Sequence, residues 1–417
     1  MLLRNSFLTS LKEFLFLILA CGLIFLFNIV LEYQNFLAFK EQKHYFIEEA
    51  KLENIYAKFK KNGKKYFVLK LKARDFNFYT TTYKDLNLSK NELLSLKIIN
   101  EDVNFKDYLA KSFYAPSYDF EILSKPKENA IISYFLNQHK NEKMQEFYGA
   151  LFFAKSISKE LRNDVNHYGI AHLIAISGYH IGLLFSLIFF LLAPLYSFFQ
   201  KRYFPYRNLR FDLSIFIFIL LFAYAYLIGF VPSFTRSLVM ALFGFYLLIK
   251  NIKILSFFNL FLCVLICISL YPNLLFSVGF FFSVLGVFYI FLYLHHFAKF
   301  FSTFVNLVLV NVWTFLMMII PVLYFFPLIS YQQFLAIFLS LIFVLFYPLV
   351  LFLHLINLGF VLDEVLLSFF AFKFHSTNCI VPFWAFCTYL LFSLLGIRFR
   401  ALAFFCILLN LIPFIFI

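Results

Sequence analysis

Long apolar segments place the strongest constraint on what this chain can fold into. A helix of about 20 apolar residues spans the hydrocarbon core of a bilayer, which is roughly 30 Å thick. Apolar segments lie near residues 14–31, 172–199, 211–230, 234–249, 254–270, 274–294, 303–328, 333–355, 378–396 and 401–417. The composition agrees, because 63% of the 417 residues are hydrophobic, whereas soluble proteins have about half. We therefore predict a polytopic α-helical membrane protein with about ten transmembrane helices.

A long polar segment interrupts this pattern after the first apolar run. Residues 40–145 carry 20 Lys and Arg and 14 Asp and Glu, so this part of the chain belongs in water. Within it, Asn62-Gly63 separates two runs of alternating apolar and polar residues, 51–61 and 64–72. Asn-Gly favours a β-hairpin turn, whose two central residues need positive φ. The predicted domains are a membrane anchor at 1–39, a small β domain at 40–125, a linker with an amphipathic interfacial helix (143–165) at 126–168, and a polytopic domain at 169–417.

One face of the predicted hairpin is basic. It carries Lys58, Lys60, Lys70 and Lys72. Four aromatic residues lie nearby in the sequence, namely Tyr66, Phe76, Phe78 and Tyr79. Proteins that bind single-stranded nucleic acid combine phosphate neutralisation with base stacking on aromatic rings. A solvated strand face above an aromatic core gives the same pattern, so both interpretations stay open here.

Basic residues between the apolar segments predict the orientation. The loop that follows the second apolar segment holds Lys201, Arg202, Arg207 and Arg210. Cytoplasmic loops carry such an excess, so this loop lies inside, the N-terminus is cytoplasmic and the β domain lies on the outer side. The segment 357–375 contains three charged residues and either lies flat at the inner face or crosses. The chain has a net charge of +14. Cytoplasmic loops account for part of this positive charge, and the rest suits binding to a polyanion or an anionic lipid.

The stretch Gly169–Leu184, GIAHLIAISGYHIGLL, is apolar enough to enter a membrane but carries polar side chains. Read as one helix, it places His172 and His180 on one face, with Ser177 one turn before His180. Gly178 lets another helix approach closely or loosens the helix locally. Histidines at membrane depth face a protein interior or a hydrated path more often than lipid. The alternative is that both histidines only bridge neighbouring helices.

Arg236 is the only Lys or Arg between Arg210 and Lys250. It either contacts a pore or substrate, or its side chain snorkels to the outer interface. The six cysteines lie in apolar runs without a CxxC pair, and the sequence has no zinc-ligand spacing or two-metal His/Asp cluster. We therefore expect no metal and no cofactor.

The stretch that begins at Gly169 resembles the ComEC family of competence proteins, which form inner-membrane channels for DNA uptake. The family pattern Gly-x-x-His-Leu-x-Ala-Ile-Ser-Gly-x-His is matched by Gly169, His172, Leu173, Ala175, Ile176, Ser177, Gly178 and His180. Weaker matches are Arg236 with Met240, the run 271–286 and the run 319–350. The resemblance covers roughly residue 145 to the C-terminus. It implies that the preceding β domain corresponds to the family's external OB-fold.

The resemblance implies transport of single-stranded DNA across the bacterial inner membrane during natural transformation, by a monomer or a homo-oligomer. The implied DNA path includes His172, Ser177, Gly178, His180, Arg236 and Ser283. The implied partners are single-stranded DNA, membrane lipid, a periplasmic DNA receptor, a cytoplasmic ATPase or helicase, and single-strand-binding proteins. The chain has no Walker-type loop and ends without the metallo-β-lactamase-like domain of many relatives. We therefore expect a channel and not an enzyme, with a separate nuclease.

Departures from the family pattern occur at Tyr179, Phe281 and Phe153-Ala154. Phe281 stands where the family usually has a glutamine, which removes one polar contact expected in the pore. Two other classes of function stay open from the residues alone. One is an intramembrane hydrolase with Ser177 as nucleophile and His180 as base. The other is a small-solute transporter, although the sequence shows no convincing internal repeat.

Overall fold

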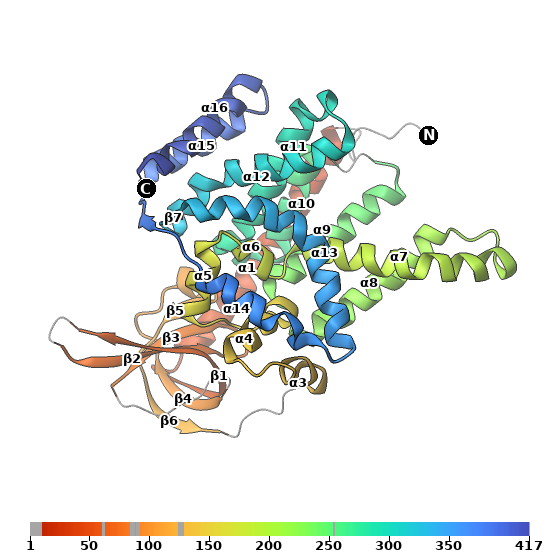
Figure 1. Ribbon diagram of the computed structural model, residues 1–417. Coiled ribbons are helices and arrows are strands. Elements are labelled where there is room, and N and C mark those ends of the chain that lie inside the picture. Colours follow the sequence, from red (N-terminus) through yellow and green to blue (C-terminus); the bar gives the residue numbers. More distant parts are fainter. Residues whose placement is uncertain are drawn as a thin grey trace. The chain divides into compact units, whose positions relative to one another are not determined.

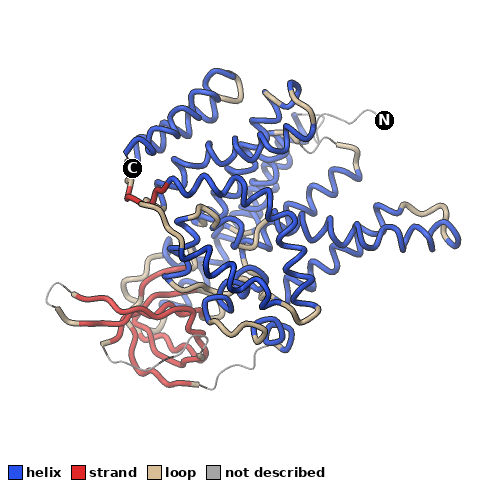
Figure 2. Tube along the Cα trace, in the orientation of Figure 1, coloured by secondary structure: helices blue, strands red, loops and turns tan. Residues whose placement is uncertain are grey.

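The computed structural model describes residues 11–60, 63–83, 88, 92–123, 129–252 and 255–416. The chain forms two compact units. The first unit holds Leu8–Asn129 and Phe261–Phe280, and the second holds Ala130–Leu260 and Phe281–Ile417. Figure 1 labels the helices and strands, and Figure 2 separates them by colour.

A six-stranded sheet forms the centre of the first unit (red in Figure 2). The strand order is β5-β3-β2-β1-β4-β6, and β3 and β5 are parallel whereas the other neighbours are antiparallel. The elements are α1 (Leu11–Lys40), β1 (His44–Phe59), β2 (Lys65–Lys72), β3 (Asn77–Thr82), β4 (Leu93–Ile99), α2 (Phe105–Leu109), β5 (Ser112–Tyr114), β6 (Ser117–Ile122), most of α10 (Phe257–Leu270) and the 3-10 helix η1 (Pro272–Phe276).

The predicted hairpin is confirmed. Strands β1 and β2 pair antiparallel, with Phe59 opposite Lys65. Gly63 has the positive φ of 77° that the turn requires, while Asn62 lies outside the described residues. The apolar residues Leu69 and Leu71 of β2 are fully buried in the core of the sheet.

The first membrane helix continues into this core. Phe39, in the last turn of α1, is 3% exposed and packs among the rings of Phe76, Tyr108 and Phe113. Further back on α1, Glu32 accepts a hydrogen bond from Lys111 Nζ at 2.6 Å. The end of α1 is therefore a structural part of the β domain and not only an anchor preceding it.

The second unit is helical. Its helices are α3 (Ala130–Leu136), α4 (Glu142–Phe153), α5 (Lys159–His167), α6 (Ala171–Ile174), α7 (Gly178–Tyr203), α8 (Leu209–Leu227), α9 (Pro232–Ile249), α11 (Val278–His296), α12 (Thr303–Phe325), α13 (Leu335–Leu355), α14 (Asp363–Ala371), α15 (Phe383–Leu395) and α16 (Arg400–Leu411). The short strands β7 (Leu328–Ser330) and β8 (Ser376–Asn378) pair antiparallel.

Six helices in the described part of the chain are long and apolar enough to cross a membrane, so the chain is a multi-pass membrane protein. They lie at Leu11–Lys40, Gly178–Tyr203, Leu209–Leu227, Val278–His296, Thr303–Phe325 and Tyr331–Leu355. The other four predicted segments also form apolar helices, but these have only 10–17 residues.

Two predicted segments have a different structure. The amphipathic pattern at 143–165 forms two helices, because Ala154 adopts a left-handed φ of 51° after α4, and Ser158 caps a new helix, α5. Most residues of helix α4 are buried inside the protein. In the open segment 357–375, α14 has nine residues, so at about 14 Å it is too short to cross a bilayer of about 30 Å.

Candidate functional site

The stretch that begins at Gly169 is not one continuous helix. Gly169 has a φ of 68° and ends the turn after α5. The short helix α6 follows, the backbone is then extended at Ala175 and Ser177, and α7 begins at Gly178. The prediction of a single helix across this stretch is therefore wrong. A glycine in the left-handed region and a serine in an extended, capping conformation both interrupt the ladder of helical hydrogen bonds.

Replacing Gly169 by alanine is expected to destabilise the protein. The left-handed conformation costs a residue with a Cβ about 1–2 kcal/mol, and the added Cβ would lie 3.3 Å from Gln333 Cβ. Gly182→Ala is the matched control, because a Cβ there meets nothing within 4 Å. The measurement is thermal unfolding in detergent. Equal unfolding temperatures for the two variants would contradict the assigned backbone conformation.

His180 fixes the beginning of α7. Its Nδ1 atom accepts a hydrogen bond from the backbone N–H of Ser177 at 3.3 Å, and Ser177 Oγ lies 3.4 Å from the same nitrogen. A side chain that reaches back to the N-cap N–H is one half of a capping box, with histidine in the place of the usual Glu or Gln. His180 is fully buried. Ser177 and His180 therefore fix the N-terminus of α7, which is the positive end of the helix dipole.

Helix α13 packs against the stretch and supplies polar and aromatic partners that sequence reasoning missed. His172 Nε2 lies 3.2 Å from Ser340 Oγ, and the hydroxyl of Tyr179 donates to the carbonyl of Ser340 at 3.0 Å. The ring of His180 contacts the rings of Phe343 and Tyr347 edge to face. The signal that could have found this helix face is Ser340, a polar residue inside a long apolar run.

Helix α9 also lies close to the start of α7. A Cβ added to Gly178 would lie 3.7 Å from Ser237 Oγ, so the two helices are close here. The neighbouring Arg236 is only 6% exposed, which does not fit the alternative of a side chain that snorkels to an interface. Ser283 lies on α11, and no hydrogen bond among the described residues joins it to this stretch. The structure thus brings together His172, Ser177, Gly178 and His180, with α9 beside them.

The hydrolase alternative requires a third group that orients the histidine base. His180 Nδ1 already accepts the backbone N–H of Ser177. Its other ring nitrogen, Nε2, is buried, and no carboxylate of the described part of the chain lies beside it. The geometry therefore favours a structural cap over an activated serine. No group of three His, Cys, Asp or Glu side chains that could hold a metal ion occurs among the residues that the structure describes.

The four predicted lysines share one face of the sheet in the first unit. They follow the alternation of β1 and β2, in which Lys58 lies opposite Tyr66 and Lys70 opposite Asn54. Lys58, Lys60 and Lys72 are exposed, whereas Lys70 forms an ion pair with Glu53 at 2.6 Å. Three of the four charges are therefore presented to solvent without a carboxylate partner close by in the described strands.

The aromatic residues of this face differ from the predicted ones. Phe76 and Phe78 are 6% and 0% exposed and belong to the core. Tyrosines take their place, because Lys58 lies over the ring of Tyr56 and Lys60 over the ring of Tyr83. The burial of Phe76 and Phe78 fits the alternative of an aromatic core beneath a solvated face, while Tyr56 and Tyr83 lie close to the basic side chains.

A buried hydrogen-bonded chain in the second unit has no counterpart in the sequence analysis. His354 Nδ1 lies 2.7 Å from the carbonyl oxygen of Val350, which can only accept, so this nitrogen carries the hydrogen. His139 Nε2 then donates to His354 Nε2 at 3.0 Å, and both Asp363 carboxyl oxygens lie 2.9 Å from His139 Nδ1. Such a chain holds α13, α14 and the segment before α4 together.

Asp363→Asn is expected to remove a pH dependence of stability. Burial raises the pKa of the Asp363 carboxyl above 3.8, and the hydrogen bond with His139 opposes this rise. A raised pKa in the folded state gives stability that is complete at low pH and is lost as the pH rises through the raised value. As the pH rises from about 4 through the raised pKa of Asp363, the unfolding temperature of the wild type should therefore fall relative to that of Asp363→Asn.

The asparagine keeps an N–H that donates to His139 Nδ1, so the variant folds with the same chain of hydrogen bonds. Asp363→Ala leaves that nitrogen unsatisfied and is expected to cost about 1–3 kcal/mol. Parallel unfolding curves for the wild type and Asp363→Asn at every pH would show that the carboxyl does not titrate in the folded protein.

Comparison with known families adds one finding. A family model described as Competence protein matches residues 153–416, which is more than half of the chain and includes the stretch from Gly169 to His180, Arg236 and Ser283. The match leaves out the six-stranded sheet and His139. No curated protein and no solved structure matches the chain.

Proposed function

We propose that this chain, which belongs to the Competence protein family, carries single-stranded DNA across the bacterial inner membrane during natural transformation. The observation that supports this most is the interrupted backbone before α7, inside the family match and beside a membrane helix. A DNA strand in the roughly 30 Å hydrocarbon core holds several phosphates there at once, each costing about 3 kcal/mol or more. Only a hydrated, protein-lined path lowers that cost.

The proposed path passes the start of α7. Irregular backbone at membrane depth is found where it lines a cavity or lies inside the protein, and helix N-termini favour anions. The exposed His172 and the buried Arg236 add polar and cationic groups to the region. In this proposal Ser177 and His180 hold the helix terminus in place, Gly178 leaves room beside it, and Ser283 joins the path on α11.

The orientation and the partners belong to the same proposal. Lys201 and Arg202 at the end of α7, Arg207 in the loop and Arg210 at the start of α8 form a basic cluster of the kind that cytoplasmic loops carry, which supports a cytoplasmic position for this loop. The N-terminus is then cytoplasmic and the sheet lies on the periplasmic side. A periplasmic receptor delivers double-stranded DNA, and a separate nuclease degrades one of its strands. A cytoplasmic ATPase and single-strand-binding proteins pull the remaining strand into the cytoplasm. The chain itself acts as a channel, as a monomer or homo-oligomer, and not as an enzyme.

The sheet is proposed to be OB-fold-like and to receive the strand. An OB-fold is a partly open, five-stranded barrel that binds oligonucleotides on the face of its second and third strands. The antiparallel β1-β2-β3 run, the pairing of β1 with β4 and the parallel pairing of β3 with β5 support this assignment. The basic face with tyrosines lies on β1 and β2.

Replacing Lys58, Lys60 and Lys72 together by alanine is expected to weaken the binding of oligo(dT) to the full-length protein. Each lost phosphate contact lowers the slope of log K against log salt by about 0.7 on a single strand, so three contacts lower it by about 2. Lys106→Ala is the control, because Lys106 is also exposed but belongs to α2 and not to the β1–β2 hairpin. An unchanged slope would exclude this face from DNA binding.

Crosslinking of the protein to DNA during transport tests the proposed channel. A photo-crosslinking amino acid is placed at Tyr179, next to the start of α7, and at Leu191, which is 62% exposed on the same helix. We expect labelled DNA to be recovered from position 179 in competent cells and not from position 191. Equal recovery at both positions would contradict a path at the start of α7. Labelling of Ser177 by a serine-reactive probe would instead support the hydrolase.

A further inference from the structure

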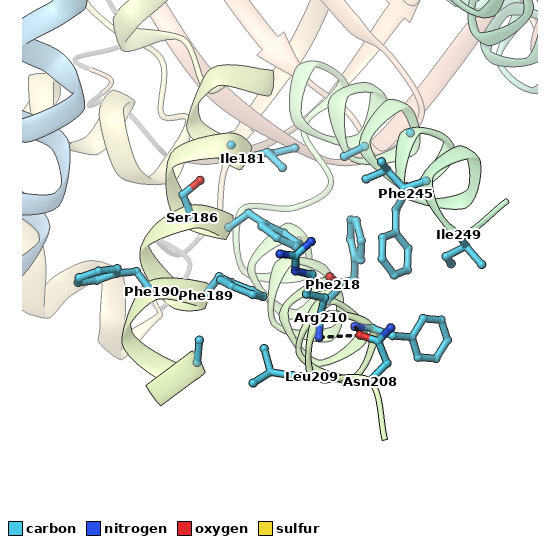
Figure 3. A pocket seen from close by; sticks show the side chains of 18 of the residues that line it. Ile181, Ser186, Phe189, Phe190, Asn208, Leu209, Arg210, Phe218, Phe245 and Ile249 are labelled. Carbon is cyan, nitrogen blue, oxygen red and sulfur yellow. Dashed lines mark hydrogen bonds between the residues drawn. The ribbon is translucent and has the colours of Figure 1, made fainter. Parts of the chain in front are cut away.

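A large groove opens between three helices of the second unit. It has a volume of about 1610 Å³ and is lined by α7, α8 and α9 (Figure 3). Small-molecule sites usually have about 300–1,000 Å³, so the groove is larger than most metabolites require. Its walls are mainly aromatic and aliphatic, with Phe185, Phe189, Phe218, Phe245 and Leu248 among them. The apolar part of this lining suits long hydrocarbon chains.

One cation breaks the apolar lining. The guanidinium of Arg210 points into the groove (Figure 3). Arg210 is exposed and forms no ion pair with any described residue. The neighbouring Arg207 is different, because it pairs with both carboxylate oxygens of Asp212, at 2.8 and 2.9 Å. The nearby carboxylate is therefore occupied, and the charge of Arg210 is left for a ligand.

The groove thus combines an apolar body with a positive charge at one end. Asn208 also lines this end, and its side chain accepts the backbone N–H of Arg210 at 3.0 Å, which fixes the first turn of α8. Basic pockets between transmembrane helices bind the headgroups of anionic lipids. Arginine recognises phosphate through paired hydrogen bonds, which are strong because both partners are charged.

We infer that the groove binds one anionic glycerophospholipid. Its phosphate lies against Arg210, and its acyl chains lie between α7 and α9 among the phenylalanines. Inorganic phosphate lacks the chains that would fill the groove, and a zwitterionic lipid adds a cation beside the phosphate. The inference does not depend on DNA transport, since it rests only on the volume, the lining and the charge of Arg210.

Native mass spectrometry of the full-length protein tests this inference. The protein is released from nanodiscs that contain phosphatidylglycerol and phosphatidylcholine in equal amounts. We expect one retained phosphatidylglycerol in the wild type, and a preference over phosphatidylcholine that falls about fivefold in Arg210→Gln, the effect of one basic residue near a membrane surface. Arg202→Gln is the control, because Arg202 is also exposed but does not line the groove.

A second variant tests the apolar part of the groove. Gly244 lines it, and a Cβ there meets nothing within 4 Å, so the ring of Gly244→Phe is expected to enter the space that the lipid would fill. Loss of both lipids in this variant supports the inference. Equal retention of the two lipids by the wild type, or an unchanged preference in Arg210→Gln, overturns it. Displacement of the lipid by single-stranded DNA, or a dimer that covers the groove, also overturns it.

Discussion

Replacing His180 by alanine is expected to reduce the entry of DNA into the cytoplasm by about 5- to 150-fold, because loss of a buried hydrogen bond costs about 1–3 kcal/mol. The backbone N–H of Ser177 loses its acceptor, and the start of α7 is no longer fixed. The measurement is the amount of labelled DNA recovered from the cytoplasm of competent cells that carry the variant as their only copy.

His180→Gln separates this structural role from other roles of the imidazole. Glutamine is a usual partner in a capping box and can accept the same N–H, so we expect it to retain most of the DNA entry. The amount of each variant in the membrane must equal that of the wild type, with Gly182→Ala as a further control. If His180→Gln is as defective as His180→Ala at normal protein levels, holding the helix terminus is not the role of this histidine.

Replacing Arg236 by alanine is expected to have an effect of similar size. Arg236 is buried on α9, which lies beside the start of α7, so its charge acts with little screening by water. A hydrogen bond to a charged group contributes about 1.5–3 kcal/mol, which corresponds to a loss of DNA entry of about 10- to 100-fold. Arg236→Lys keeps the charge but loses the bidentate geometry, so we expect an intermediate value.

The matched control for Arg236 is its neighbour Ser237. Ser237→Ala removes a polar atom at the same depth without changing the charge. Normal DNA entry in Arg236→Ala, at a normal amount of protein, would remove Arg236 from the proposed path. Equal defects in Arg236→Ala and Ser237→Ala would indicate general damage to the packing of α7 and α9.

Features that depend on local sequence were predictable. Apolar runs of sufficient length led to helices, and Asn62-Gly63 between alternating runs led to the β1–β2 hairpin, because both signals come from neighbouring residues. The breaks inside helices were harder to predict. Around Ser177 the chain is as apolar as a continuous helix would be, and around Ala154 the amphipathic pattern continues, so hydrophobicity does not reveal where the hydrogen-bond ladder ends.

Contacts between distant residues could not be predicted from one sequence. His139 and Asp363 are 224 positions apart, and His172 and Ser340 are 168 apart. Each residue alone is an isolated polar group in a mixed segment, with no neighbouring residue to suggest its partner. The aromatic residues of the sheet show the same difficulty. Phe76 is buried in the core, whereas other aromatic residues, Tyr56 and Tyr83, contact the lysines. Which aromatic side chain lies on which face depends on how the strands pair in the folded sheet.

The fate of labelled double-stranded DNA in a deletion strain, with and without the wild-type gene restored, tests the central claim most directly. The measured quantities are nuclease-protected label outside the inner membrane, label in the cytoplasm, and transformant yield. The proposed channel predicts that without the protein, protected DNA accumulates outside while cytoplasmic label and transformants disappear, and that the restored gene reverses both changes. Unchanged entry of label into the cytoplasm of the deletion strain would contradict a role of this protein as the DNA channel.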